Sequence, residues 1–519
     1  AVKGKVRARG KGLENPKLNT GEIEVLVDEL EVLNKAETPP LEVNDRVELN
    51  EDVRLKYRYL DLRKPQMQHN ILVRHKAVKL VRDYFDALGF LEIETPMLGK
   101  STPEGARDYL VPSRVNPGKF YALPQSPQIL KQICMIAGFD KYFQIVKCFR
   151  DEDLRTDRQP EFTQIDVEMS FIEQEDIFLL IEGLMKEMWK KILNKDIKTP
   201  FNKLTYQEAM EKYGSDKPDL RFGLELIDVT DAVKKSSFEV FTKVINEKGK
   251  VKCINAKKCA NFSRNDLDEL IEFVKIYDAK GMAWMKVAEK GLESNIVKYF
   301  DEKAQKELIK AADAKKDDLL LFVADHKHHI VDIALGHLRN ELARRLKLAD
   351  DKEHNFVWIT DFPLVEFDED EQRHVAVHHP FTSPKDEDIK LLDSDVEKVR
   401  AKAYDITLNG IEIGGGSIRI YKPELQKKMF KILGISDKEA EKKFGFLINA
   451  FKYGAPPHGG IALGMDRIVA MLTGNTSIRE VIAFPKTKNA EDLMMETPSE
   501  VNEKQLKEIS IKLDLVKKR

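Results

Sequence analysis

The chain has 519 residues, of which 34% are charged and 42% hydrophobic, and its formal net charge at pH 7 is −2. The length predicts about three domains, and the near-neutral charge excludes a chain-wide basic field, so a nucleic-acid partner has to meet local basic patches. Four cysteines are too few for a disulfide scaffold, and no run of about 18 apolar residues indicates a membrane span. We therefore expect a cytoplasmic protein without a membrane partner.

Residues 1–44 contain short strand-like pieces. Val2–Ala8 opens the chain, and in Glu22–Val27 the apolar residues alternate with polar ones. Two or three strands do not form a stable domain alone. We therefore interpret residues 1–44 as the last strands of a small β-barrel whose beginning lies upstream of Ala1. Residues 45–66 are predicted to be a charged hinge.

A helix with apolar residues at helical spacing is predicted over residues 68–88, with Gly89 as its stop signal and a strand over residues 90–97. Residues 221–345 are richer in Lys and Glu, and strand-like segments resume at Asn355. Features in the region 355–485 pair with those in the region 100–170. The sequence thus predicts one α/β catalytic domain, in parts 67–220 and 346–519, split by an insertion at 221–345.

Two strands, at residues 142–150 and 161–171, are predicted to form an antiparallel pair joined by a charged loop. Alternation places Gln164, Asp166, Glu168 and Ser170 on one face of the second strand. Such a face is costly to bury unless it lines a ligand site. Taken alone, the strand fits a solvent-facing sheet surface better.

A hairpin is predicted around Asn409-Gly410, the strongest short turn signal in the chain. Thr407 then faces Glu412, and Asp405 lies diagonally to Glu412 at roughly 7–8 Å between Cα atoms. Two carboxylates at that distance can share Mg²⁺. Strict alternation places Arg419 on the opposite face, and a bulge in the glycine run 414–416 would bring it to the same face. An exposed hairpin with solvated acids is the alternative.

Three other segments each have an ordinary and a functional interpretation. A glycine-rich strand enters an apolar helix with Arg467 in its first turn, which is either a phosphate site or an ordinary helix start. Gln128 and Lys131 share a helix face, after a loop at 101–106. The tract 325–329 (Asp-His-Lys-His-His) fits a solvated surface better than a metal site.

Together these segments resemble the three signature motifs of class II aminoacyl-tRNA synthetases. Residues 89–96 resemble motif 1, residues 149–171 motif 2, and residues 460–467 motif 3, with Ala462 where glycine is frequent. The finer resemblance, along almost the whole chain, is to the bacterial-type aspartyl-tRNA synthetases. It is carried by the segments 102–109, 125–128, 149–166, 378–381 and 413–419.

This resemblance implies an α/β (α+β) fold with an antiparallel-sheet catalytic core, an inserted α+β domain and a remnant of an N-terminal anticodon-binding OB barrel. It implies activation of L-aspartate by ATP, transfer to the 3′ end of tRNA-Asp, and a homodimer through motif 1. Charging of tRNA-Asn is left open. The alternatives are an ammonia-dependent asparagine synthetase-like enzyme, a non-catalytic tRNA-binding paralogue, and an asparaginyl- or lysyl-tRNA synthetase.

The resemblance also implies roles for individual residues. Arg150, Arg467 and Glu412 would be catalytic, and Asp405 and Glu412 would hold Mg²⁺. Arg419 would grip the ligand carboxylate bidentately, with Lys131 as a second cation. The implied ATP-binding residues are Arg150, Asp151, Glu152, Gln159, Glu412, Gly464, Met465, Asp466 and Arg467. The implied aspartate-binding residues are Glu104, Ser126, Gln128, Lys131, Arg150, Asp166, His378 and Arg419.

Overall fold

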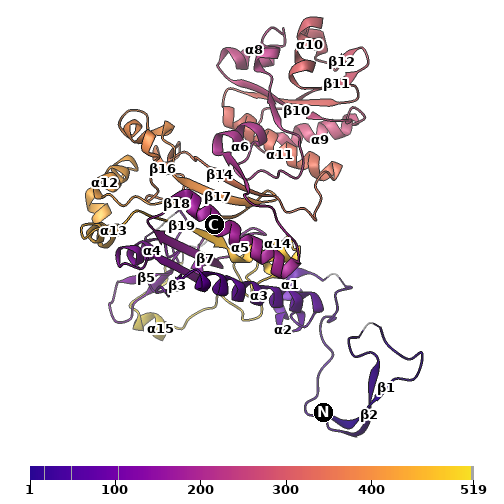
Figure 1. The fold of residues 1–519 in the computed structure, drawn as a ribbon, viewed down its shortest axis with the longest axis vertical. Helices are drawn as coiled ribbons and strands as arrows, with labels where there is room; N and C mark the ends of the chain where they lie inside the picture. Colours follow the sequence, from indigo (N-terminus) through magenta and orange to yellow (C-terminus); the bar gives the residue numbers. More distant parts are fainter. Residues whose placement is uncertain (17, 48, 103–104, 516–519) are drawn as a thin grey trace.

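One large sheet organises the chain (Figure 1). The computed structural model describes residues 1–16, 18–47, 49–102 and 105–515. The eight-stranded sheet has the order β3-β6-β7-β19-β18-β17-β14-β8, antiparallel except at its two edges, where β3 and β6 are parallel, as are β14 and β8. The strands are β3 (Leu91–Glu92), β6 (Lys141–Phe149), β7 (Glu161–Ser170), β8 (Asn202–Thr205), β14 (Phe356–Thr360), β17 (Ala403–Leu408), β18 (Ile411–Ile418) and β19 (His458–Gly464).

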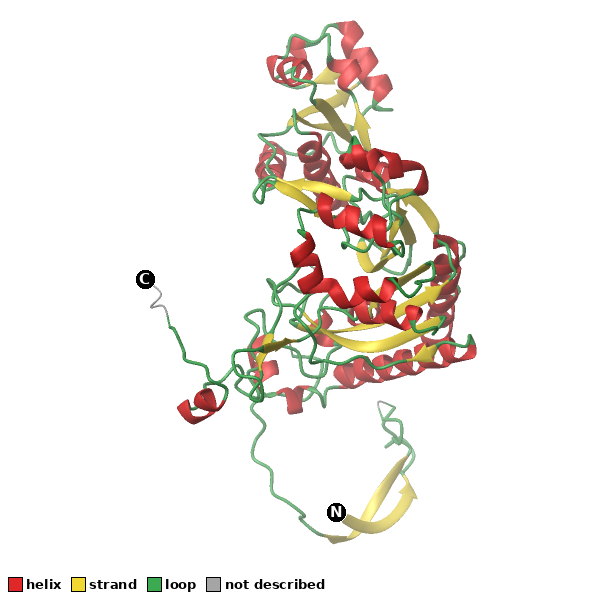
Figure 2. Cartoon of the chain, turned by 90° about the vertical axis from the view of Figure 1, so that its left-hand side faces the viewer, coloured by secondary structure: helices red, strands yellow, loops and turns green. Residues whose placement is uncertain are grey.

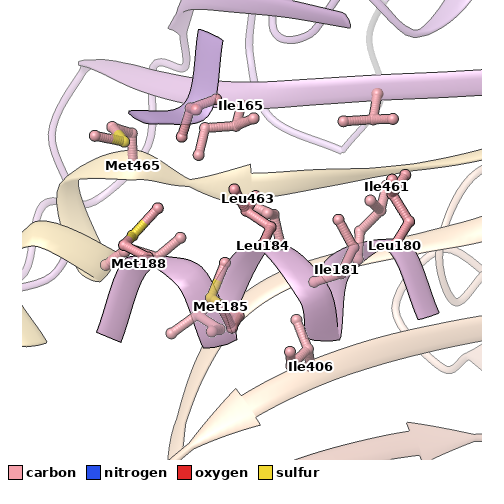
Figure 3. Packing of buried hydrophobic residues seen from close by; sticks show 14 of the residues in the cluster. Ile165, Leu180, Ile181, Leu184, Met185, Met188, Ile406, Ile461, Leu463 and Met465 are labelled. Atoms are coloured by element: carbon pink, nitrogen blue, oxygen red, sulfur yellow. The ribbon is translucent and has the colours of Figure 1, made fainter. Parts of the chain in front are cut away.

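Three helices cover one face of this sheet: α3 (Pro65–Ala87), α5 (Gln174–Leu193) and α14 (Met465–Thr473). Figure 3 shows how apolar side chains of α5 pack against strands from both halves of the chain. Each such buried side chain stabilises the fold by about 1.5–3 kcal/mol relative to an exposed one. The residues labelled there are Ile165, Leu180, Ile181, Leu184, Met185, Met188, Ile406, Ile461, Leu463 and Met465.

The predicted helix over residues 68–88 is confirmed as α3. Pro65 starts it because proline suits the first helical position, and Gly89 follows its end with a φ of +76°, a conformation that favours glycine. The strand predicted over residues 90–97 is wrong beyond Glu92. After Ile93 donates its N–H to the carbonyl of Phe143, the chain leaves the sheet.

The antiparallel pair of β6 and β7 is confirmed, with Gln144 opposite Asp166. The solvent-facing interpretation of β7 is wrong, because Gln164, Asp166 and Glu168 are all buried. Helix α4 (Gln128–Ile136) packs over this face, and Lys131 on α4 reaches both carboxylates. The polar face of β7 therefore lies inside the molecule, on the side opposite the apolar helices.

A second, five-stranded sheet has the order β12-β11-β13-β10-β9, with antiparallel pairings throughout. Two separate apolar clusters cover its two faces, and it lies apart from the large sheet in Figure 1. It is built from residues between β8 and β14, which agrees with an insertion at about 221–345; that range remains our proposed boundary. This sheet and its helices form the inserted unit. Its elements are β9 (Leu226–Asp228), α7 (Thr230–Val233), α8 (Glu239–Asn246), β10 (Lys250–Ala256), α9 (Arg264–Lys275), β11 (Ala283–Ala288), β12 (Gly291–Glu293), α10 (Glu302–Ala311), β13 (Leu319–Asp325) and α11 (His328–Leu346).

The N-terminal strands β1 (Val2–Ala8) and β2 (Ile23–Leu30) form an antiparallel pair whose side chains are almost all exposed. Figure 2 shows this pair apart from the rest of the chain. That it is a barrel remnant stays a prediction. In the segment after it, Arg58 of α2 (Arg58–Asp61) donates to the carbonyls of Arg479, Ile482 and Ala483; that residues 45–66 form a hinge stays a prediction.

The remaining elements surround the large sheet or follow it. In the described part of the chain, no helix combines the length and the apolar character that crossing a bilayer requires. These elements are α1 (Glu51–Lys56), β4 (Leu110–Pro112), β5 (Phe120–Ala122), α6 (Tyr206–Tyr213), β15 (Val365–Asp368), β16 (Arg373–Ala376), α12 (Pro423–Ile432), α13 (Asp437–Phe451) and α15 (Glu503–Glu508).

Candidate active site

A cavity of about 520 Å³ lies over the polar face of the large sheet. Strands β7, β17, β18 and β19 form its floor, and α4 and several loops form its walls. Both halves of the split catalytic unit contribute. The sequence-predicted residues that line it are Ser126, Gln128, Lys131, Arg150, Glu152, Gln159, Asp166, His378, Asp405, Glu412, Arg419, Gly464, Asp466 and Arg467.

The hairpin of β17 and β18 has the predicted turn and a bulge just after it. Leu408 pairs with Ile411 and Thr407 with Glu412, but Ile406 pairs with Gly414, so Ile413 is an extra residue. The bulge lies at Ile413, one residue before the glycine run 414–416 in which the sequence allowed for it, and it brings Arg419 to the cavity side together with Glu412.

Glycines in the cavity floor make room for the site carboxylates. A Cβ added to Gly415 would lie 2.3 Å from Oδ1 of Asp405, and one added to Gly460 would lie 2.1 Å from Oε2 of Glu168. A side chain at Gly415 would displace Asp405, and one at Gly460 would also clash with the carbonyl oxygen of Val167, 2.0 Å away. The glycines thus let carboxylate oxygens of Asp405 and Glu168 pack closely against the backbone of the sheet.

A buried network of four charges closes one end of the cavity. Lys131 Nζ lies 2.6 Å from Asp166 Oδ1 and 3.3 Å from Glu168 Oε2. Arg419 donates from Nε to Glu168 Oε1 at 2.9 Å and from Nη2 to Glu168 Oε2 at 3.0 Å. These four side chains are at most 2% exposed.

The bidentate edge of Arg419 is therefore occupied by Glu168, which corrects the expectation that this edge grips a ligand. Nη1 of Arg419 donates to Ser417 Oγ at 2.7 Å and lies 2.6 Å from Nε2 of His379. A ligand carboxylate would meet the Nη end of the guanidinium together with Lys131. Glu168 holds the two cations together and lowers the cost of burying them.

The pKa values in this network follow burial and charge. Burial would raise the pKa of Glu168, but Arg419 and Lys131 lower it further than burial raises it. Burial raises the pKa of Asp166, against the opposing effect of Lys131. Burial, and then the positive charge of Arg419, hold the pKa of His379 well below its usual value. His379 is thus a neutral imidazole beside a permanent cation.

Three buried polar atoms at this end have no hydrogen-bond partner within the described residues: Gln128 Nε2, Asp166 Oδ2 and His378 Nδ1. Buried polar groups are nearly always paired, so orphans that gather in a cavity point to a bound ligand. The orphans combine an amide donor, a carboxylate acceptor and an imidazole nitrogen. A small ligand with both donors and acceptors matches them.

The other end of the cavity is more open. Arg467 Nη1 donates to the carbonyl of Glu412 at 2.8 Å, and its Nη2 lies 3.2 Å from Asp157 Oδ2. Arg158 pairs with Glu152 at 3.1 Å. The guanidinium of Arg150 lies 5.1 Å from the ring centre of Phe162. Flat cationic and aromatic groups of this kind offer a stacking surface for a base.

Asp405 lies between the two ends, beside His378, and Glu412 lies beside Arg467 at the open end. Burial, and then repulsion by Asp405, raise the pKa of Glu412. Burial would lower the pKa of His378, but Asp405 Oδ1, 3.2 Å from its Nε2, raises it instead. The described residues contain no group of three or more acidic, His or Cys side chains that could hold a metal by themselves. Mg²⁺ usually binds one or two carboxylates together with substrate phosphates, so this pair fits it.

Several predicted residues are placed elsewhere or are already engaged. The Met465 side chain lies in the apolar core, and Asp151 lies outside the cavity lining, 3.7 Å from Arg107. Gln159 pairs its amide with the backbone of Lys486, donating at 3.0 Å and accepting at 2.7 Å. Asp466 pairs with Arg74 at 2.5 Å. Glu104 lies outside the described residues.

The structure also adds residues that sequence reasoning did not assign to the site: Gln164, Glu168, His379, Asp157 and Asp216. Four of them line the cavity, and Glu168 binds the cations that do. The alternation of β7 had already placed Glu168 beside Asp166, which was a usable signal. Nothing in the sequence indicated Asp216, because it precedes the inserted unit and reaches the cavity only through the tertiary fold.

A family model described as tRNA synthetases class II (D, K and N) matches residues 50–488. The chain belongs to this family. Within the family, curated relatives with high similarity to the chain are aspartate–tRNA ligases. The chain is 58% identical to an aspartate–tRNA(Asp/Asn) ligase of Thermoanaerobacter sp. (strain X514), over 99% of this chain and 87% of the relative.

Two further relatives agree. An aspartate–tRNA(Asp/Asn) ligase of Caldanaerobacter subterraneus subsp. tengcongensis is 59% identical over 99% of this chain and 87% of its own length. An aspartate–tRNA ligase of Macrococcus caseolyticus is 55% identical over the same shares. The predicted resemblance to the aspartyl-tRNA synthetases is thereby confirmed, as is the antiparallel-sheet core of the class II fold.

Proposed function

We propose that the protein activates L-aspartate with ATP and transfers the aspartyl group to the 3′ end of tRNA-Asp. The observation that carries this proposal is the buried charge network of Lys131, Arg419, Asp166 and Glu168. At this end of the cavity, Lys131 and Arg419 lie near Oδ2 of Asp166, which has no hydrogen-bond partner among the described residues. A short amino acid with an acidic side chain complements this end in charge and size.

In the proposed complex, the side-chain carboxylate of aspartate faces Lys131 and the Nη end of Arg419. Oδ2 of Asp166 accepts from the α-ammonium group, and Nε2 of Gln128 donates to the ligand. Asparagine would place the N–H donors of its amide against the N–H donors of Lys131 and Arg419, where aspartate offers only acceptors. Sites built for a specific polar group reject analogues that lack it by large factors, so strong discrimination follows.

ATP occupies the open end in this proposal. Arg150 contacts the α-phosphate and the substrate carboxylate, Glu152 the adenine amino group, and Arg467 the γ-phosphate. The attacking group is the α-carboxylate of aspartate, which is already an anion, so no protein base is required. Catalysis consists of positioning and charge neutralisation.

Asp405 and Glu412 would hold Mg²⁺, which neutralises charge on the phosphates when it is bound. The two acids come from neighbouring strands, and Gly415 leaves the space that Asp405 needs. His378 keeps Asp405 in place through its contact at 3.2 Å.

The proposal also includes tRNA-Asp as partner, a homodimer through residues 89–96 and the helix before them, and a cytoplasmic location. Charging of tRNA-Asn is a separate question, because relatives of both descriptions are similar to this chain. Aminoacylation of purified tRNA-Asp and tRNA-Asn in parallel answers it. Sedimentation at several concentrations tests the dimer.

ATP–pyrophosphate exchange tests the activation step. Exchange should depend on aspartate and be negligible with asparagine, and Lys131→Met should abolish it. The matched control is Lys147→Met, since Lys147 is half exposed on the neighbouring strand β6. No exchange by the unmodified protein would defeat the proposal, and release of free asparagine with ammonia would favour an asparagine synthetase-like enzyme.

A further inference from the structure

A loop at the root of the inserted unit lies against the open end of the cavity. It follows α6, and its Asp216 lines the cavity. Asp219 in the same loop packs on the turn of the β17–β18 hairpin, where a Cβ on Gly410 would lie 3.1 Å from the Asp219 Cβ. The loop is therefore in contact with the hairpin that carries Asp405 and Glu412.

Helix α11 of the inserted unit holds this loop from the other side. Gly214, at a φ of +64°, lies so close to α11 that an added Cβ would be 2.0 Å from the carbonyl oxygen of Asp332. Arg339 of α11 is 1% exposed and donates to the carbonyls of Asp219, Phe222 and Gly223 at 2.7, 2.8 and 3.1 Å. Because this buried guanidinium donates hydrogen bonds to three carbonyls of the loop, it fixes the path of the loop.

The loop carries two cations: Arg221 is paired with Asp219 at 2.7 Å, whereas Lys217 is held loosely. Its ammonium lies 3.8 Å from Asp216 Oδ1, and the two side chains are 48% and 41% exposed. An ion pair this long and this exposed costs little to break. Because Asp216 lines the cavity, this pair places the Lys217 ammonium next to the lining.

We propose that Lys217 is a further substrate-contacting residue, which binds the terminal phosphates of ATP and the pyrophosphate that leaves. The inference rests on the proposed function, which places the triphosphate at the end of Arg467 and Glu412. That end is lined by the acids Glu152, Asp157, Asp216 and Glu412, with Asp405 close by, against the lining cations Arg150, Arg158 and Arg467. A polyanion arriving there needs more positive charge.

Lys217 supplies that charge without rearrangement of the fold, because only the pair with Asp216 has to open. Asp216 then serves to keep the ammonium at the mouth of the cavity before the nucleotide arrives. Arg339 acts through the loop and is a positioning residue. The inserted unit thereby takes part in the activation step, since its helix α11 sets the position of a phosphate-binding cation.

The test is ATP–pyrophosphate exchange by the full chain, with KM measured separately for ATP, pyrophosphate and aspartate. Lys217→Ala should raise the KM for ATP and for pyrophosphate about tenfold and leave the KM for aspartate within about twofold. Lys217→Arg should restore most of the loss, because it keeps the charge. The matched control is Lys212→Ala, which removes the same charge from the exposed end of α6.

Because KM does not depend on the active fraction, partial misfolding of a variant would lower the rate and leave this pattern unchanged. Equal KM values for Lys217→Ala and Lys212→Ala would overturn the inference, as would a rise in the KM for aspartate equal to that for ATP. Failure of the proposed function looks different, because the unmodified protein would then show no aspartate-dependent exchange.

Discussion

The two ends of the cavity differ in how their charged side chains are paired and exposed to water. At the closed end, the side chains of Lys131 and Arg419 are 2% exposed and are paired with Glu168, 0% exposed, and Asp166, 1% exposed. At the open end, Arg467, Glu412 and Asp157 are 24%, 40% and 46% exposed, and their ion contacts are 3.2 and 3.9 Å long.

The difference follows from solvent. Charges out of contact with water must be paired within the protein, so the closed end is built in advance and can select its ligand. Charges near water are weakly coupled. The open end can therefore rearrange when a phosphate chain and a cation arrive. Four substitutions, taken from the largest expected effect to the smallest, test this contrast.

Glu168→Gln should destabilise the protein by about 3–5 kcal/mol, because it removes a charged partner from a buried network. Urea unfolding measures this loss. The control is Glu161→Gln on the same strand, whose side chain is 36% exposed and should cost less than about 1 kcal/mol. Similar losses for both variants would remove the distinction between the two ends.

Glu412→Gln should lower the exchange rate by about 100-fold or more, since it removes a group that serves the charged transition state. Stability should stay the same or rise, because partial burial and then Asp405 raise the pKa of Glu412, so that the folded state disfavours its ionised form. Exchange assays over a range of Mg²⁺ concentrations and thermal melts measure the two effects. A marked loss of stability would contradict this interpretation.

His379 should make the closed end sensitive to acid. Its pKa is lowered in the folded state by burial and then by Arg419, His378 and Lys131, so below about pH 6.5 the unfolded chain binds the extra proton. Stability then falls as the pH drops below about 6.5, at up to about 1.4 kcal/mol per pH unit. His379→Gln should lose this part of the pH dependence.

Urea unfolding of both proteins at pH 7 and pH 5.5 measures the difference. His378 has a raised pKa and acts in the opposite direction, but it is present in both proteins and cancels in the comparison. Parallel pH profiles would show that His379 is not held neutral by its surroundings.

Arg158→Ala should have the smallest effect on stability, below about 1 kcal/mol, because its pair with Glu152 is partly exposed. The loss should disappear at 1 M salt, where such pairs are screened. Thermal melts at low and high salt measure it. A salt-independent loss would show that the open end is more rigid than we infer.

The local parts of the site could be predicted from the sequence. The turn at Asn409-Gly410 fixes the pairing of Thr407 with Glu412, as predicted. The alternation in β7 places Asp166 and Glu168 on one face, and the glycine-rich strand β19 leads into a helix with Arg467 in its first turn. These features depend on neighbouring residues, so the sequence contains the information.

Other expectations failed where distant segments meet. The polar face of β7 is buried because α4 packs over it, and nothing in the strand itself signals that cover. Gln159 lines the cavity, and its role at ATP stays a prediction, but the sequence did not show that its amide pairs with the distant backbone of Lys486. The bidentate edge of Arg419 meets Glu168 because β7 and β18 both flank β19.

The sequence by itself thus determined the strands and the turn, the charged residue types and, by resemblance, the family. The tertiary structure decided which of those charges are neutralised by each other and which remain for a ligand. The physical reason is that periodicity and turn chemistry act over a few residues. The pairing of buried charges, in contrast, depends on the order of strands in the sheet and on the helices that exclude water from it.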